Sequence, residues 1–134
     1  MKQKYEAMVL SCIDPRFQKP VHKYLDKKKL ARKFSAFTIA GGSIGVTSEK
    51  FKKWHSTFWE NLETSINLHK INKLIVINHK DCGAAKIVNG KKKFYSSIEN
   101  KIHKISFAKL KRKLKKKFPK IKVYFKVLSL KNVL

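Results

Sequence analysis

Two cysteines and a histidine stand where apolar segments of the chain end, and these residue types bind transition metals. Cys12 follows the first apolar run, whereas His79 and Cys82 follow the most continuous one. Zinc accepts thiolate and imidazole ligands, and catalytic zinc sites combine three protein ligands with one open position. The His-x-x-Cys spacing lets both side chains point at one centre, and Gly83 is expected to relieve the backbone there. The spacing therefore predicts a Zn²⁺ site, the alternative being two buried structural cysteines and a hydrogen-bonded histidine.

A carboxylate and a guanidinium stand beside the first cysteine. Asp14 and Arg16 lie two residues apart in the turn that follows Cys12. They could form an exposed ion pair of little consequence, worth about 0–1 kcal/mol. They could instead hold a carboxylate beside the metal, where it would accept a hydrogen bond from a metal-bound hydroxide and orient it. The spacing alone leaves both interpretations open.

The pattern of apolar residues predicts the elements that position these side chains. Continuous or alternating apolar runs predict strands over residues 5–11, 35–40, 74–77 and 121–127. A period near 3.6 residues predicts helices over about 20–33, 47–70 and 96–118. This alternation predicts an α/β fold with a mainly parallel sheet flanked by helices. The last strand, charged on one face, is expected at an edge, and the 134 residues are expected to form one domain, 1–134.

The two long helices have predicted inner faces. For the helix over 47–70, capped at Thr47-Ser48-Glu49, the apolar face is Phe51, Trp54, Phe58, Leu62, Ile66 and Leu68. For the helix over 96–118, ended by Pro119, the inner residues are Ile102, Ile105, Leu110, Leu114 and Phe118. Ligands of an open parallel sheet bind beyond the carboxyl ends of its strands. Both cysteines, and the pair Gly41-Gly42 after the second strand, are expected at that edge.

Three motifs, taken in order, resemble the β-class carbonic anhydrases. They are Cys-x-Asp-x-Arg after the first strand, a glycine pair after the second, and His-x-x-Cys-Gly after the third. The segments 63–68 and 123–127 are also similar to regions of that family, so the resemblance covers most of the chain. It implies that Cys12, His79 and Cys82 are zinc ligands and that Asp14 and Arg16 form a dyad. It also implies that Gly41, Gly42 and Gly83 lie beside the substrate.

The resemblance also implies an activity and a partner. A zinc-bound hydroxide, oriented by Asp14, would hydrate carbon dioxide to bicarbonate in a small apolar pocket, and the enzyme would be a homodimer or a higher homo-oligomer. The chain departs from the family pattern at Thr38-Ile39, where an Arg-Asn pair is usual, and at Pro15, where serine is common. It also lacks the N-terminal helical arm that commonly braces a dimer partner.

Two other functions stay open at this point. The same site could hydrolyse another small heterocumulene, such as carbonyl sulfide or carbon disulfide. Alternatively, Asp14 could ligate the metal itself and close the site, which would leave a non-catalytic zinc-binding protein.

The net charge of +25 suggests either a polyanion-binding surface or a solvated lysine-rich one. Lysines account for 30 of the 33 basic residues and are scattered along the chain, whereas base readout favours arginine. The sequence therefore favours the solvated surface, and we expect no nucleic-acid partner. No apolar run reaches the length of about 18 residues that a membrane span needs, and no signal-like core opens the chain. We expect a cytoplasmic protein, in which a disulfide is disfavoured.

Overall fold

The computed structural model describes residues 5–130. Its strands are β1 (Ala7–Ser11), β2 (Phe34–Thr38), β3 (Lys73–His79) and β4 (Lys122–Leu128). Its α-helices are α1 (Gln18–Lys27), α2 (Ser43–Thr47), α3 (His55–His69), α4 (Gly83–Asn89) and α5 (Ser96–Lys117). Two 3₁₀ helices, η1 (Pro15–Phe17) and η2 (Glu49–Trp54), precede α1 and α3. Within residues 5–130, no helix is both long enough and apolar enough to cross a membrane.

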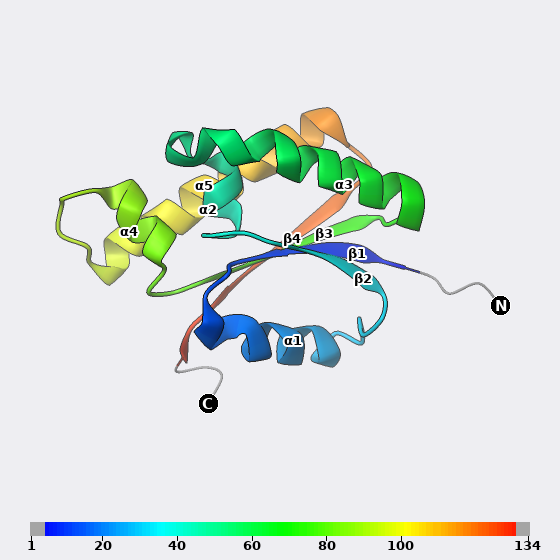
Figure 1. Cartoon of the computed structure of the whole chain (residues 1–134), viewed down its shortest axis with the longest axis horizontal. Helices are drawn as coiled ribbons and strands as arrows, with labels where there is room; N and C mark the ends of the chain where they lie inside the picture. Colours follow the sequence, from blue (N-terminus) through cyan, green and yellow to red (C-terminus); the bar gives the residue numbers. More distant parts are fainter. Residues whose placement is uncertain (1–4, 131–134) are drawn as a thin grey trace.

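The four strands form one parallel sheet in the order β2-β1-β3-β4. This confirms the predicted α/β fold and the position of the last strand at an edge. β1 and β3 are central, and nearly all of their residues are buried, as continuous apolar runs predict. β4 alternates between exposed and less exposed residues over most of its length, as an edge strand with one wet face does. Figure 1 shows α1 on one face of the sheet and α2, α3 and α5 on the other.

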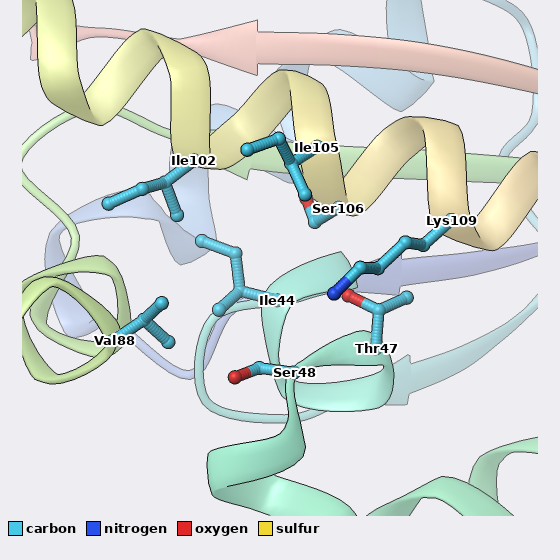
Figure 2. A pocket seen from close by; sticks show the side chains of 8 residues that line it. All are labelled: Ile44, Thr47, Ser48, Val88, Ile102, Ile105, Ser106 and Lys109. Atoms are coloured by element: carbon cyan, nitrogen blue, oxygen red, sulfur yellow. The ribbon is translucent and has the colours of Figure 1, made fainter.

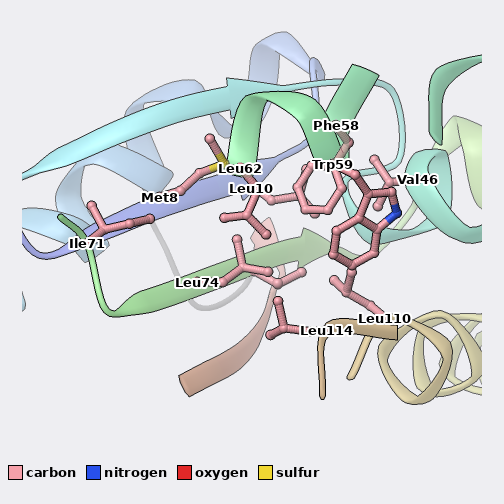
Figure 3. Close-up of a cluster of buried hydrophobic side chains, with 11 residues drawn as sticks. Met8, Leu10, Val46, Phe58, Trp59, Leu62, Ile71, Leu74, Leu110 and Leu114 are labelled. Atoms are coloured by element: carbon pink, nitrogen blue, oxygen red, sulfur yellow. The ribbon is translucent and has the colours of Figure 1, made fainter. Parts of the chain in front are cut away.

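Successive side chains of β1 and β3 point to opposite faces of the sheet, and each face has its own core. The larger core lies under α2, α3 and α5 and includes Met8 and Leu10 from β1 together with Leu74 and Val76 from β3 (Figure 3). The smaller core lies under α1. Its members from the sheet and from the α1 side are Ala7, Val9, Phe17, Val21, Leu25, Leu30, Ile75, Ile77 and Leu128.

The predicted helix over 47–70 is divided in the structure. Ser48 caps its beginning as expected, since its side chain accepts a hydrogen bond from the Lys50 backbone amide, but the capped element is η2. Phe51 leaves the helical region with φ of −119°, and α3 begins only at His55. Leu68 is 71% exposed, because two residues after Ile66 it lies away from the buried face of α3. The buried side of α3 instead consists of Phe58, Trp59, Leu62 and Ser65.

Helix α5 has nearly the predicted ends, but part of its predicted inner face is wrong. Ile105 is 55% exposed. The buried residues are Glu99, His103, Ser106, Leu110 and Leu114. These five continue one helical face at the spacing of three and four residues, and the three polar ones are buried because they find hydrogen-bond partners.

Other boundaries also differ from the prediction. The first helix, expected over 20–33, ends at Lys27, and the left-handed residues Lys29 and Arg32 turn the chain into β2. The sequence pattern did not predict α4.

Candidate metal centre

The three predicted metal ligands come together at the carboxyl edge of the sheet. Cys12 directly follows β1, His79 is the last residue of β3, and Cys82 precedes α4. β1 and β3 are hydrogen-bonded neighbours, so their ends meet. All three residues are buried, and their ligand atoms lie within 4.8 Å of one another. The sequence prediction that these side chains share one place is therefore confirmed, and metal binding by them stays a prediction.

The His79 ring is oriented as a metal ligand would be. Its Nδ1 lies 2.8 Å from the carbonyl oxygen of Lys80, which can only accept, so Nδ1 carries the proton. Nε2 therefore presents a lone pair, yet it is buried without a hydrogen-bond partner. The ring is held in place by stacking on Phe17, with 4.2 Å between ring centroids. Metal-ligating histidines typically donate their other N–H to a carbonyl in this way.

The two cysteines lie close enough to share a proton. The hydrogen bond from Cys82 is the main reason that the pKa of Cys12 falls to about 4, with further help from His79 and the Gly41 amide against the effect of burial. The thiolate of Cys12 and burial raise the pKa of Cys82. Burial by itself would lower the pKa of His79, but Cys12 and the Lys80 carbonyl raise it. One sulfur is thus poised as a thiolate, and a bound metal would displace the remaining protons.

Asp14 and Arg16 form the predicted ion pair. Asp14 Oδ1 accepts from the Arg16 backbone N at 2.9 Å and from Nε at 3.1 Å, and Oδ2 accepts from a terminal guanidinium nitrogen at 2.7 Å. These bonds lower the pKa of Asp14 to about 2. Asp14 Oδ2 lies 3.7 Å from the unpartnered Nε2 of His79. The carboxylate is therefore held beside the candidate ligands with both oxygens occupied by Arg16.

Asp81 also belongs with Asp14 and Arg16, although the sequence did not indicate this contact. Arg16 also donates to the Asp81 carboxylate at 3.0 Å and to its carbonyl oxygen at 3.0 Å. Asp81 adopts the left-handed conformation with φ of 59°, which aspartate tolerates. We call Asp14, Arg16 and Asp81 the Arg16 cluster. Gly83 was expected to relieve the backbone of this turn, but it has no positive φ and begins α4, so the strained residue is Asp81.

The loop after β2 requires its pair of glycines because atoms of neighbouring residues lie too close for a side chain. Gly41 has φ of 82°, and a Cβ on it would lie 2.7 Å from the Cβ of Ala84. Gly42 has φ of 56°, and its Cβ would lie 2.7 Å from the side-chain oxygen of Asn78. Because the loop packs so closely, the Gly41 amide reaches the Cys12 sulfur at 3.2 Å. These contacts give both glycines a structural role, and contact with a substrate stays a prediction for Gly41, Gly42 and Gly83.

A buried carboxylate supports the metal loop from the interior. Glu99 on α5 is 3% exposed. It accepts hydrogen bonds from the backbone amides of Asp81 and Cys82, both at 3.0 Å. Burial by itself raises the pKa of Glu99, but these two amides and His103 lower it overall. The turn that carries Cys82 is therefore held by an ionised carboxylate.

The hydrogen bonds continue from Glu99 to the glycine loop. His103 Nε2 lies 3.2 Å from Glu99, and its Nδ1 accepts from the Asn78 amide nitrogen at 2.8 Å. Asn78 also donates to the Ser43 hydroxyl at 2.8 Å and accepts from the Ser43 backbone at 3.1 Å. The Ser43 and Ser106 hydroxyls lie 2.7 Å apart. We call Glu99, His103, Asn78, Ser43 and Ser106 the Glu99 network.

Two sequence signals could have indicated this network. Asn78 is a polar residue at the end of the most apolar strand. Glu99, His103 and Ser106 extend the face of Leu110 and Leu114 by helical spacing.

Apolar side chains surround the two sulfurs. Ile44, Ala84 and Ala85 pack with Cys12 and Cys82 in a buried cluster. Ile44 also lines a hollow of about 80 Å³ between α2, α4 and α5. Figure 2 shows Ile44 together with Val88 and Ile102 around this hollow. Ile44 therefore lies between the sulfur cluster and a small, mainly apolar space that none of the candidate ligands lines.

Comparisons with known proteins found relatives of similar sequence and a solved structure of similar fold. The chain is 27% identical over 129 residues to an uncharacterized protein of Rickettsia bellii, covering 96% of this chain and 79% of the relative. It is also 27% identical over 128 residues to an uncharacterized protein of Rickettsia conorii, covering 95% and 69%. Its fold is similar to that of a carbonic anhydrase from Glaciozyma antarctica, with a TM-score of 0.62, 16% identity and coverage of 97% of this chain and 80% of the other.

A family model supplies the assignment. The model described as "Putative carbonic anhydrase" matches residues 1–127, nearly the whole chain. The structural comparison supports the same fold. The chain therefore belongs to this carbonic anhydrase family.

Proposed function

We propose that this protein binds one zinc ion through Cys12, His79 and Cys82 and hydrates carbon dioxide reversibly to bicarbonate. The observation that carries the proposal is the buried, unpartnered Nε2 of His79, which lies with both sulfurs inside 4.8 Å. An uncompensated buried nitrogen is costly, and a metal ion would satisfy it. When bound, zinc supplies Lewis acidity that brings the pKa of a coordinated water from 15.7 to about 7 in well-studied carbonic anhydrases.

The Arg16 cluster supports an open site. For Asp14 to become a fourth ligand, it would have to give up the three hydrogen bonds that Arg16 donates to it. Held as it is, the carboxylate can accept a hydrogen bond from the nucleophile and orient it towards the substrate. This favours catalysis over the closed, non-catalytic alternative.

The hollow beside Ile44 is compatible with a small apolar substrate, although none of the candidate zinc ligands lines it. Its volume is about 80 Å³ and its lining is mostly apolar, which suits a linear, uncharged molecule. Carbon dioxide, carbonyl sulfide and carbon disulfide share that description, and membership of the family favours carbon dioxide.

Stopped-flow measurement of carbon dioxide hydration on zinc-loaded protein tests the proposal, with Cys82→Ser as the control. We expect one zinc per chain and a zinc-dependent rate that the control loses. One bound zinc without any rate would overturn the proposal and favour a closed site or another heterocumulene. The latter would be detected by release of sulfide from carbonyl sulfide.

Three further properties are part of the proposal. We infer one domain over 1–134, a cytoplasmic location and a homodimer or higher homo-oligomer. Light scattering at several protein concentrations tests the oligomeric state, and a monomer at all of them would contradict it.

A further inference from the structure

The outer surface of α5 carries basic residues over most of its exposed arc, among them Lys104, Lys111 and Lys115 besides the four described next. Four basic residues repeat at positions i, i+3, i+4 and i+7, which share one face of a helix. We call them the basic stripe; they are Lys109, Arg112, Lys113 and Lys116. All four are exposed, and they line a hollow of about 330 Å³ together with Thr47 and Glu49. The sequence scatters its lysines, but the fold places these four on one wall.

The charges of the basic stripe are not compensated. The ion pairs among residues 5–130 involve other cations, and none includes a stripe residue. Lys109 and Lys113, like Arg112 and Lys116, are like charges one turn apart, an arrangement that destabilises a helix. An anionic partner would remove this repulsion. The stripe therefore has the electrostatics of a binding surface for anions.

A second group of basic residues adjoins the stripe on η2. The hollow there has a volume of about 610 Å³ and is lined by Glu49, Lys50, Phe51, Lys52, Lys53 and Trp54. Glu49 lines both hollows, so the two surfaces are continuous. His55 is close to both surfaces. Burial is the main cause of its lowered pKa, and the charges of Lys113 on the stripe and Lys52 on η2 also contribute to the lowering.

The η2 surface also carries aromatic rings. Phe51 and Trp54 stack with 4.7 Å between centroids and 1° between planes. Trp54 is 36% exposed. Lysines flanking an exposed aromatic ring are the combination that single-stranded nucleic acids bind, because bases stack on the ring while phosphates meet the charges.

We propose that, contrary to the expectation from the sequence, the basic stripe and η2 form a surface that binds single-stranded nucleic acid without sequence preference. The stripe from Lys109 to Lys116 is about 10 Å long, which is enough for two or three successive phosphates. Its charges are mostly lysines, which neutralise phosphates as point charges and lack the fork that reads guanine. The partner is therefore recognised through its backbone and its stacking bases.

A lipid surface fits these residues less well. Membrane-surface helices combine basic residues with a broad apolar face. Trp54 is the only strongly exposed large apolar side chain among the described residues that line these two hollows. None of these residues is a candidate metal ligand, although Lys109 and Thr47 also line the hollow of about 80 Å³ beside Ile44.

Fluorescence anisotropy with a labelled single-stranded oligouridylate of about 16 nucleotides tests the surface, at salt from about 50 to about 200 mM. The variant removes the four charges of the stripe by Lys109→Gln, Arg112→Gln, Lys113→Gln and Lys116→Gln. We expect binding by the unmodified protein that weakens steeply with salt. In the variant we expect affinity at least about tenfold weaker and a salt slope shallower by about 2.

A matched variant separates the surface from the overall charge. It removes four positive charges from α1 and its C-cap, on the opposite face of the sheet (Figure 1), by Lys19→Gln, Lys23→Gln, Lys27→Gln and Lys28→Gln. We expect it to lose less than about threefold in affinity. Trp54→Leu should weaken binding about fivefold or more with an unchanged salt slope. Circular dichroism melts establish that each variant folds.

Three outcomes would overturn the proposal. The first is an equal loss in both fourfold variants, which would mean that overall charge alone governs binding. The second is the absence of salt-dependent binding by the unmodified protein. The third is binding to phosphatidylserine–phosphatidylcholine vesicles without binding to the oligonucleotide.

Discussion

Arg16 and Glu99 both contact the turn at Asp81, one from the solvent side and the other from the interior. The Arg16 side chain is 42% exposed and donates to the carbonyl and carboxylate of Asp81. Glu99 is 3% exposed and accepts from the amides of Asp81 and Cys82. One backbone turn is thus held by solvated charges on one side and by a buried carboxylate on the other.

The difference in burial assigns different roles to the two groups. Exposed ion pairs contribute about 0–1 kcal/mol, because water and salt screen them. Removing a buried acceptor costs about 1–3 kcal/mol for each amide that is left without a hydrogen-bond partner. The Glu99 network should therefore determine the stability of the turn. The Arg16 cluster should mainly determine where the Asp14 carboxylate stands.

The largest effect is expected from Glu99→Ala. The change leaves the amides of Asp81 and Cys82 without an acceptor in the interior, so the free energy of unfolding should fall by about 3 kcal/mol. Urea denaturation measures it. Glu60→Ala on the exposed side of α3 is the control, expected within about 0.5 kcal/mol of the unmodified protein. Equal values for the two variants would contradict the role of the Glu99 network.

Arg16→Ala should affect metal binding more than folding. Without the guanidinium, Asp14 loses its position beside the ligands, and zinc affinity should fall about tenfold or more. Competition with a chromophoric chelator measures this affinity. The unfolding free energy of the metal-free protein should change by less than about 1 kcal/mol. A loss of stability as large as that of Glu99→Ala would remove the distinction between the two groups.

Ser106→Ala probes the far end of the Glu99 network. It removes the hydroxyl that pairs with Ser43 at 2.7 Å and donates to the His103 carbonyl at 2.8 Å. The cost should be about 1 kcal/mol by thermal denaturation. Ser97→Ala, at an exposed position of the same helix, should change stability by less than half of that. If the two variants melt alike, the network ends before Ser106.

The smallest effect is expected at Glu6, an exposed ion pair at the opposite edge of the sheet. The hydrogen bond from Lys73 lowers the pKa of Glu6 against the opposing effect of burial, and Lys33 contributes to the lowering. Because its folded pKa is depressed, its contribution is present above the unfolded value and disappears as pH falls through the folded value. Glu6→Gln should therefore cost about 0.5 kcal/mol at pH 7 and nothing at about pH 3. A difference that persists at low pH would show that packing, not charge, is responsible.

Much of the fold and the candidate ligand set could be predicted from the sequence. The buried runs that become β1 and β3 are continuous and apolar, and such runs favour central parallel strands. Carboxyl ends of parallel strands meet at one edge, so Cys12 could be placed beside His79 and Cys82 from sequence alone. The alternation in β4 likewise predicted an edge strand.

The partners of these residues depend on tertiary structure. Arg16 meets Asp81 across 65 residues of sequence, and no local pattern encodes that contact. The predicted inner face of α5 is partly wrong. Ile105 is predicted to be buried because it is apolar, whereas the polar residue Glu99 is the one that is buried.

The sequence by itself therefore determined where the strands lie, which of them are buried on both faces and which reactive residues stand at their ends. Local hydrophobic periodicity locates the strands, and the residue types at their ends can then be read directly. Only the tertiary structure decided which polar groups are buried and which charges share a surface. Glu99 can be buried because α5 packs where the amides of Asp81 and Cys82 donate hydrogen bonds to its carboxylate. The basic stripe shares a hollow with Glu49 of η2, and α2 packs on α5, where Ser43 and Ser106 lie 63 residues apart in sequence.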